Sequence, residues 1–466
     1  MPQLVARIWA TSLLLAALVA TPATAQPTPF DSVQVRLLKS ALPRTIVVSG
    51  SQGLDLFSAN EPNAIARLKP NEKLTITTSG SRLYFKLRDA GGIYAIRLRL
   101  IQPDDGELTI ELAEAQSKPT RDHIYKGLMK VEVDPTRAAT VKMVNQVAIE
   151  DYVESVLSSE FGFEELEASK AMAICIRTLS WRSLLQHGPE YELPDHDIWQ
   201  VYHGVSPITR TAREATRRTE GQVMTYGGEL IEAVYHSSSG GYTANHEEVW
   251  DAQLVLPYLR GKRDPYDAIS PYSDWTIELP KKELLQALSE DNDMKVTGIR
   301  VDGIGRDRRV KNVLLLQSNG DPRSIRSNAF RLTVNRRFGK DKLRSTLFTV
   351  DSKADSYVFT GKGFGHGVGL SQYGALEMSK QGHLYNEILA YYFEGVTVGQ
   401  PSGYEELVAG NAGNANVPTA QAMGFPREES PSKPEVVEEA PPIQIDFELP
   451  APAESAKKTS RRRIGW

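Results

Sequence analysis

The sequence predicts an α+β fold, and three observations support that class. Residues 32–115 alternate short β-prone runs with turns, residues 145–186 carry two successive helical patterns, and residues 276–400 mix strands with short helices. Strands and helices do not alternate regularly, as they would in a doubly wound parallel sheet. The chain of 466 residues is 41% hydrophobic and 24% charged, which is typical of a soluble globular protein with two or three domains.

The first 25 residues, MPQLVARIWATSLLLAALVATPATA, predict a secretory signal peptide. Arg7 gives a cationic start, an apolar run follows, and Ala23-Thr24-Ala25 is a small-residue cleavage site. We therefore expect a signal peptide over residues 1–25, with an uncleaved membrane anchor as the alternative. The mature chain would begin near Gln26, outside the cytoplasm. No later segment has the roughly 20 continuous apolar residues that a membrane span needs.

Residues 26–117 predict a small β-rich module. The stretches RTIVVSGSQGLDLF, EKLTITTSGSRLYFKL and GELTIELA combine β-branched and aromatic residues with turn residues at short intervals. A further strand-rich stretch, IYKGLMKVEVDPTRAATVKMVNQ, opens the domain that we expect over residues 118–400.

Two helices are predicted next. Apolar residues recur at helical spacing between positions 149 and 157, and Glu150 and Asp151 would lie in the first turn, where negative charge suits the helix dipole. The segment SSEFGF breaks this pattern, and a second helix is expected from about Glu164 to Gln186. Because this helix is apolar around most of its circumference, it should be central and buried.

The elements that follow are shorter. After a loop-rich stretch, QVMTYGGELIEAVYHSSSGGYT predicts a hairpin that turns at Gly227-Gly228. VKNVLLLQS and STLFTV predict strands, whereas KKELLQALS, SQYGALEMSKQ and YNEILAYYF predict helices. Residues 401–466 are rich in proline, alanine, glutamate and serine, and predict a disordered tail that ends in the basic KKTSRRR.

The stretch GKGFGHGVGLSQYGA has glycine at every second position from Gly361 to Gly369. This period is that of a β-strand, so we expect a strand with one bare face that a ligand or another backbone approaches closely. His366 would project from the opposite face. The spacing matches neither G-x-x-x-x-G-K-[ST] nor G-x-G-x-x-G, so a phosphate-binding loop is not expected.

Composition argues against several functions. The net charge of -4 disfavours nucleic-acid binding, which needs a basic surface. The single cysteine, Cys175, excludes an internal disulfide and the cysteine-rich zinc motifs, and it lies in an apolar helical pattern where a packed thiol is expected. The eight histidines form no H-E-x-x-H or other tight pair, so no metal and no cofactor are expected. A metallohydrolase that uses these histidines is an open alternative.

Glu160 is the candidate catalytic acid. It lies at the break between the two predicted helices, where a carboxylate can face a cleft, and Phe161 and Phe163 would raise its pKa by desolvation. Lys170 and Arg177 are seven residues apart and share one face of the second helix. That face holds either structural ion pairs or a site for an anionic group.

Five stretches in the same order resemble the stage II sporulation protein D (SpoIID/LytB) family, whose members act on bacterial cell-wall peptidoglycan. They are VNQVAIEDYVESVLSSEFGFEELEASKAMAICIRT, DHDIWQVYHGV, GGELIEAVYHSSSGGYTANHEEVW, LPYLRGKRDPYD and GKGFGHGVGLSQYGALEMSKQG. In this family the glutamate of an E-M-P turn is regarded as the catalytic acid of a lytic transglycosylase. Glu160 matches that glutamate, although Phe161 and Gly162 replace the methionine and the proline.

The resemblance also implies substrate-binding positions and excludes one kind of metal site. Some members carry a zinc site built partly from cysteines, which a chain with one cysteine cannot form, so no metal is carried over. The matching positions, expected to bind substrate, are Lys170, Arg177, Gln200, Tyr202, Ser239, Gly240, Gly241, His366 and Gln372.

The function that the resemblance implies is an exported enzyme, periplasmic or associated with the cell wall. It would cleave the MurNAc–GlcNAc bond of peptidoglycan glycan strands, stripped of their peptides, by non-hydrolytic transglycosylation that leaves a 1,6-anhydroMurNAc end. The alternative is a non-catalytic glycan-binding protein that enhances a separate N-acetylmuramoyl-L-alanine amidase, which would then be a partner. No nucleic-acid partner is expected.

Overall fold

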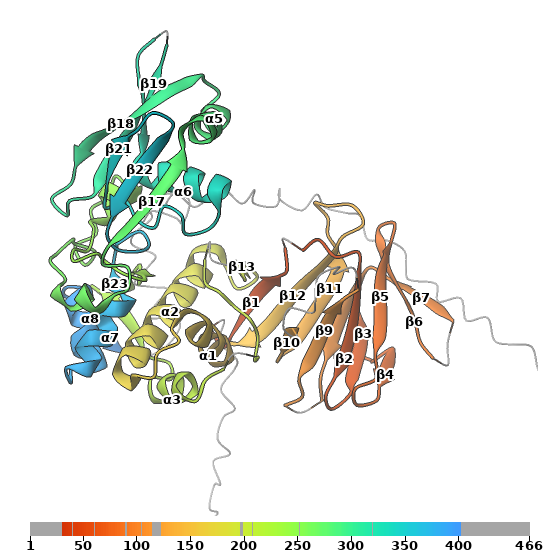
Figure 1. Cartoon of the computed structure of the whole chain (residues 1–466). Coiled ribbons are helices and arrows are strands. Elements are labelled where there is room, and N and C mark those ends of the chain that lie inside the picture. Colours follow the sequence, from red (N-terminus) through yellow and green to blue (C-terminus); the bar gives the residue numbers. More distant parts are fainter. Residues whose placement is uncertain are drawn as a thin grey trace, which may run out of the picture. The chain divides into compact units, whose positions relative to one another are not determined.

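The structure is a computed structural model that describes residues 30–401 except residues 40, 60, 89–90, 104, 114–122, 196–198, 207, 251 and 319. The predicted signal peptide, and all of the predicted tail but its first residue, lie outside the described residues. Strands gather in sheets apart from the main helices, which confirms the α+β class (Figure 1). In the part of the chain described, no helix is long and apolar enough to cross a membrane.

Two large sheets form from the first half of the chain. The first has the order β13-β1-β12-β11-β8-β3-β4 and consists of β1 (Ser32–Leu37), β3 (Leu54–Ser58), β4 (Ala66–Leu68), β8 (Arg97–Ile101), β11 (Leu128–Val133), β12 (Val141–Ala148) and β13 (Glu192–Pro194). The second has the order β10-β9-β2-β5-β6-β7 and consists of β2 (Thr45–Gly50), β5 (Leu74–Ser79), β6 (Arg82–Lys86), β7 (Gly92–Ala95), β9 (Leu108–Leu112) and β10 (His123–Tyr125).

The short strands predicted over residues 32–115 are observed, and side chains alternate along them. In β2, for example, buried side chains occur at every second position, because successive side chains of a strand point to opposite faces. β1 pairs along its whole length with β12, so the first sheet contains strands from both sides of the predicted boundary between residues 117 and 118. A separate module over residues 26–117 therefore stays a prediction.

Helices α1 (Ile149–Glu160) and α2 (Leu166–His187) follow β12 in sequence and are confirmed close to their predicted positions. Sixteen of the residues of α2 are buried, including Cys175, as the apolar pattern predicted. α2 contacts α1, α3 (Arg210–Arg218), α7 (Gln372–Lys380) and α8 (Tyr385–Tyr392), and is thus the central helix of this layer. Its core is continuous with that of the two sheets.

Several small sheets complete the fold. β14 (Val223–Tyr226) and β15 (Glu229–Leu230) form the hairpin predicted at Gly227-Gly228, and β24 (Thr397–Gly399) pairs with β14. β16 (Tyr235–His236) pairs in parallel with β23 (Leu370–Ser371), which brings together segments more than 130 residues apart. The short α4 (His246–Trp250) and the 3₁₀ helix η1 (Pro265–Ile269) lie between these strands in sequence.

Residues 275–361 surround a second hydrophobic core. It is built on β17 (Trp275–Pro280), β21 (Phe348–Ser352) and β22 (Ser356–Gly361) as one sheet, and β18 (Val296–Ile304), β19 (Val310–Gln317) and β20 (Arg323–Arg326) as another. Helices α5 (Lys281–Asn292) and α6 (Ser327–Phe338) contact these sheets. Its buried aromatic side chains include those of Trp275, Phe330 and Phe359.

The prediction of a strand through the alternating glycines is wrong. β22 ends at Gly361, and the following glycines have positive φ angles of 76° at Gly363, 104° at Gly365, 85° at Gly367 and 71° at Gly369. A strand needs negative φ throughout, so the alternation serves left-handed backbone and not a strand. We call residues 361–369 the glycine segment.

Close approach, the other part of that prediction, is observed. A Cβ atom would lie 2.8 Å from the Gly240 nitrogen at Gly363, 2.9 Å from the His236 Cβ at Gly365, and 2.1 Å from the Val234 carbonyl oxygen at Gly369. The glycine segment therefore lies directly against residues 234–240.

Candidate active site

Glu160 is the last residue of α1. The helix ends there because Phe161 leaves helical geometry, with φ of -133°, while its N–H still donates to the Leu157 carbonyl at 2.9 Å. The Val201 N–H donates to Glu160 Oε1 at 2.8 Å. The C-terminal end of a helix disfavours negative charge, whereas an N–H donor favours it, so opposing effects act on this carboxyl group.

Two tyrosines lie near Glu160, the buried Tyr152 and the partly buried Tyr235. Burial, and after it the negative charge of Glu160, raise the pKa of both Tyr152 and Tyr235 well above the ordinary range. Both hydroxyls therefore stay protonated. Tyr152 Oη donates to Gln200 Oε1 at 2.9 Å, which ties α1 to the loop that carries Val201.

Gln200 is 1% exposed, and Ser180 Oγ of α2 also donates to its Oε1, at 3.3 Å. The structure thus places Gln200 beneath the site, where it fixes the position of Val201, and no described contact takes it to the surface. Tyr202 is likewise buried, at 3% exposed, and its hydroxyl donates to Asn145 Oδ1 of β12 at 2.7 Å. Substrate contacts by these two side chains stay a prediction that their burial disfavours.

Gln372 reaches the same place from α7. Its Nε2 donates to the backbone carbonyl of Glu160 at 3.2 Å. α7 begins here because Ser371 caps it, with Oγ accepting from the Gly374 N–H at 3.2 Å. The start of α7 and the end of α1 therefore meet at Glu160, although they are 212 residues apart in sequence.

An array of aromatic rings leads away from Glu160. Phe161, next to Glu160, packs edge-to-face on Phe163 with ring centroids 4.8 Å apart. From Phe163 the contacts continue to Tyr373 at 5.2 Å, from Tyr373 to Tyr272 at 5.9 Å, and from Tyr272 to Phe364 at 4.9 Å. We call Phe163, Tyr373, Tyr272 and Phe364 the aromatic row. All four are only partly buried, whereas Phe161 is buried.

The Ser239-Gly240-Gly241 turn wraps a carboxylate of the protein itself. Asp267 in η1 is 1% exposed and accepts from the Ser239 N–H at 3.0 Å and the Gly240 N–H at 2.8 Å. The hydroxyls of Ser238 and Ser371 donate to the same carboxylate at 2.7 and 2.8 Å. The turn thus holds η1 and the start of α7 together, and its predicted contact with substrate is untested.

A second buried carboxylate, Asp264, lies beside the first. Burial, and then the charge of Asp267, raise the pKa of Asp264 from 3.8 to about 6. Tyr392 Oη of α8 lies 3.2 Å from both carboxylate oxygens and donates to them. The motif RDPYD was part of the family resemblance, but nothing in its spacing alone indicated that these two aspartates form a buried pair.

His366 does not project from a free face, contrary to the expectation from the strand pattern. Its ring packs on Trp250 at 5.0 Å and on His236 at 5.6 Å, and its Nδ1 accepts from the Val368 N–H at 3.1 Å. Burial, and then the cation of Arg331, lower the pKa of His366 to about 3, so the ring is neutral near pH 7. Burial likewise lowers the pKa of His236.

Arg177 and Lys170 lie in ion pairs. Arg177 is fully buried, and it donates to both carboxylate oxygens of Glu150, at 2.8 and 2.5 Å, and to the Gln222 carbonyl at 3.0 Å. Lys170 pairs with Glu167 at 2.6 Å and lies over the Tyr385 ring. Both contacts favour structural ion pairs over a site for an anionic group, the two alternatives that the sequence left open. Binding of substrate by either residue stays a prediction.

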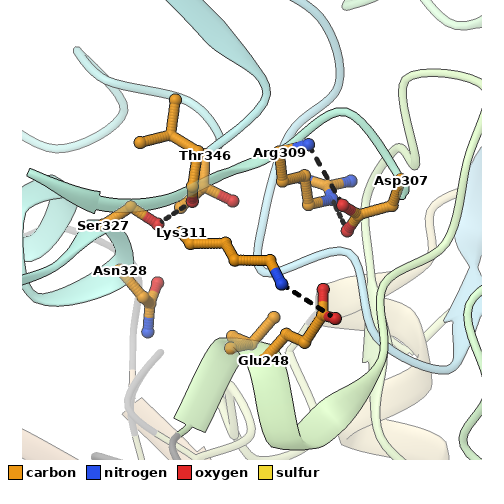
Figure 2. A pocket seen from close by; sticks show the side chains of 9 residues that line it. Glu248, Asp307, Arg309, Lys311, Ser327, Asn328 and Thr346 are labelled. Carbon is orange, nitrogen blue, oxygen red and sulfur yellow. Dashed lines mark hydrogen bonds and ion pairs between the residues drawn. The ribbon is translucent and has the colours of Figure 1, made fainter. Parts of the chain in front are cut away.

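A separate small pocket lies between α4 and residues 307–346 (Figure 2). Its charged side chains pair with each other, Lys311 with Glu248 at 3.4 Å and Arg309 with Asp307 at 3.5 Å. Arg309 also donates to the Ser239 carbonyl at 2.7 Å. Its side chain therefore connects the strands around the second core to the Ser239-Gly240-Gly241 turn. Glu160 does not line this pocket.

The described residues contain no group of three or more histidines, cysteines, aspartates or glutamates arranged to hold a metal ion.

Known proteins resemble this chain in the same regions. Residues 137–226 match the family described as SpoIID, Stage II sporulation protein, and residues 275–369 match a Domain of unknown function (DUF8618). The first match includes Glu160, Lys170, Arg177, Gln200 and Tyr202, and the second includes His366.

Full-length relatives extend this likeness. Stage II sporulation protein D of Bacillus subtilis is 29% identical over 300 residues, which are 60% of this chain and 83% of that protein. The Amidase enhancer of Bacillus subtilis is 30% identical over 278 residues, 50% of this chain but 38% of that protein. An uncharacterized protein of Brachyspira hyodysenteriae is 30% identical over 262 residues, 56% of this chain and 68% of that protein. The chain belongs to the stage II sporulation protein D (SpoIID/LytB) family.

Proposed function

We propose that this protein is a peptidoglycan lytic transglycosylase in which Glu160 is the acid and then the base. The observation that carries the proposal is the position of Glu160: a half-buried carboxyl group at the end of α1, held through Val201 and Gln372 at the meeting point of two helices. The matched residues of the family include this glutamate.

In the proposed reaction, the Glu160 carboxyl proton passes to the glycosidic oxygen between MurNAc and GlcNAc. The bond from that oxygen to C1 of MurNAc breaks, and the 6-hydroxyl oxygen of the same MurNAc bonds to C1. The hydroxyl proton passes to the Glu160 carboxylate, which restores the acid. No water is consumed, and the products are a GlcNAc hydroxyl end and a 1,6-anhydroMurNAc end. Such positioned acid–base catalysis contributes about 10²–10⁴-fold to the rate.

The surroundings of two buried aspartates, Asp264 and Asp267, are consistent with a mechanism that uses one carboxylate. A hydrolase needs a second carboxylate to activate water or attack C1. Asp264 and Asp267 are 0% and 1% exposed and accept hydrogen bonds from protein groups, so neither is placed to activate water at a bound glycan. Gln200, Tyr152 and Gln372 act as positioning residues, because they fix the two segments that hold Glu160.

Digestion of purified, peptide-stripped glycan strands tests the proposal. We expect wild type to release anhydro ends and Glu160→Gln to lose that release by about 10²–10⁴-fold. Glu164→Gln is the matched control, because Glu164 is exposed and only four residues away, and it should retain activity. Release of anhydro ends by Glu160→Gln at the wild-type rate would refute the assignment.

The second candidate function is binding of glycan without cleavage, in support of an amidase. It is favoured by the relative named Amidase enhancer, which is 30% identical to this chain. Here wild type and Glu160→Gln would both bind insoluble peptidoglycan and produce no new ends, and wild type would raise the rate of an added N-acetylmuramoyl-L-alanine amidase.

Either function requires export to the periplasm or cell wall, which we propose from the predicted signal peptide. N-terminal sequencing of the protein from an expressing bacterium should give a chain that begins near Gln26. A secreted-fraction protein that still begins at Met1 would contradict this part of the proposal.

A further inference from the structure

The aromatic row differs from the hydrophobic cores of the protein. Its four rings come from four segments: the turn after α1, the start of α7, the loop after η1 and the glycine segment. Tyr373, Tyr272 and Phe364 belong to neither hydrophobic cluster, and all three are partly exposed. The fold thus brings distant aromatic residues together next to Glu160 without burying them.

The polar atoms of the row are available for a ligand. Among the described residues, neither the Tyr272 hydroxyl nor the Tyr373 hydroxyl has a hydrogen-bond partner, although both residues are bonded through their backbones. Burial, and then the neighbouring Tyr272, raise the pKa of Tyr373, so the Tyr373 hydroxyl stays protonated near pH 7. A tyrosine hydroxyl can both donate and accept a hydrogen bond.

A cation lies at the row. The Arg344 guanidinium lies 5.3 Å from the centre of the Tyr272 ring, and it is partly exposed. In the part of the chain that the structure describes, Arg344 makes no ion pair with a carboxylate. Arginine is suited to bidentate binding of a carboxylate, and stacking on a ring keeps its donors pointing outward.

We propose that the aromatic row and Arg344 form a binding subsite for the glycan strand beside the bond that Glu160 cleaves. Sugar C–H groups, which carry partial positive charge, would stack on the electron-rich ring faces. The two tyrosine hydroxyls would bond to sugar hydroxyl or acetamido groups, and Arg344 would bind the lactyl carboxylate of a MurNAc residue. This inference rests on the proposed function for the identity of the ligand.

Arg344 takes the place of Lys170 and Arg177 as the candidate cation for an anionic group of the substrate. The sequence offered Lys170 and Arg177 for an anionic group of the substrate, but both are paired within the protein. Arg344 lies in none of the five stretches that resemble the family, and only the fold reveals that it contacts the Tyr272 ring. Arg344 is therefore a cation at the aromatic row that could bind a carboxylate of the ligand.

The test measures binding and not cleavage, in a Glu160→Gln background, by isothermal titration calorimetry. One ligand is chitohexaose, which has sugar faces and no charge, and the other is peptide-stripped glycan strands, which carry lactyl carboxylates. The variants are Tyr272→Leu and Tyr373→Leu, which keep apolar volume but remove the ring, and Arg344→Gln. The controls are Tyr94→Leu and Arg82→Gln, both exposed on the second N-terminal sheet.

We expect each tyrosine variant to weaken both ligands by about tenfold. Arg344→Gln should weaken the charged strands by about tenfold and chitohexaose by less than about twofold. The controls should leave both affinities unchanged. The proposal is overturned if both tyrosine variants, with melting temperatures near that of the parent, bind chitohexaose as the parent does, or if Arg344→Gln affects both ligands equally.

Because the background cannot cleave, this result is independent of the digestion experiment. Loss of binding in the row variants together with an absence of anhydro products would leave the subsite in place and remove the transglycosylase. Anhydro products together with unchanged binding would support the transglycosylase and rule out the subsite.

Discussion

Gly369 shows most directly why single residues decide the shape of the site. Its φ is +71°, which L side chains rarely adopt, and an added Cβ would lie 2.1 Å from the backbone oxygen of Val234. Two separate costs therefore apply there, one from backbone conformation and one from collision with backbone that cannot rotate away.

The comparison of Gly369→Ala with Gly382→Ala separates these costs. Gly382 also has positive φ, +91°, but nothing lies within 4 Å of its Cβ position. We expect Gly382→Ala to lower the free energy of unfolding by about 1–2 kcal/mol, and Gly369→Ala to lower it by about 1–3 kcal/mol more. Urea unfolding measures both, and equal losses would show that close approach at Gly369 is unimportant.

Asp264 gives the fold a dependence on pH. Because its folded pKa of about 6 is above the ordinary 3.8, the folded state binds more protons than the unfolded state between these values. Its contribution to stability is greatest below about pH 4 and is lost as the pH rises through about 6. The total change corresponds to about 3 kcal/mol.

Asp264→Asn should remove this dependence, because asparagine still accepts from Tyr392 and adds no charge beside Asp267. The measurement is the free energy of unfolding of wild type and variant across this pH range. The advantage of the variant should grow as pH rises, whereas the exposed control Asp302→Asn should run parallel to wild type. A constant difference between Asp264→Asn and wild type would contradict the account.

At the scale of elements, the Arg177–Glu150 pair joins the start of α1 to α2. Arg177 is 0% exposed while the Glu150 side chain is 27% exposed. Removal of one partner of a buried pair is costly because the other partner loses its compensation.

We expect Arg177→Leu to destabilise the protein by about 3–5 kcal/mol, because Arg177 is fully buried. Lys170→Leu should destabilise it less, because the Lys170 side chain is 12% exposed and pairs with Glu167, one turn away on the same helix. Thermal unfolding measures the loss of stability in both variants. Calorimetric titration with chitohexaose, at a temperature where Arg177→Leu is folded, measures whether that variant also changes ligand affinity. Unchanged affinity is the expected result. A loss of affinity in a folded, stable Arg177→Leu would show that Arg177 binds ligand after all.

Most helices and strands whose apolar residues recur at regular spacing can be predicted from the sequence, whereas those without such spacing cannot. α1, α2, α5, α7, α8 and the hairpin at Gly227-Gly228 are where their apolar patterns placed them. The segment of α3 is predicted as a loop because RTAREATRR has few apolar residues, and the helix buries only the small side chains of Ala212, Ala215 and Thr216. The glycine segment was misjudged because a period of two also arises when alternate residues adopt positive φ.

At the scale of the whole molecule, the site exists only because segments far apart in the sequence converge on Glu160. Val201, Tyr235 and Gln372 meet it from three separate parts of the chain. The resemblance to a family could indicate Glu160 and Gln372, since both lie in recognisable motifs. It could not indicate Tyr272 or Arg344, whose place beside the site depends on how two hydrophobic cores are joined.

The most direct test of the account is mass spectrometry of glycan strands incubated with the protein in isotopically labelled water. Intramolecular attack by the 6-hydroxyl predicts new 1,6-anhydroMurNAc ends that contain no label, and their loss in Glu160→Gln but not in Glu164→Gln. New reducing ends that carry the label, or anhydro ends that persist in Glu160→Gln, would contradict the claim that Glu160 alone supplies the acid and the base.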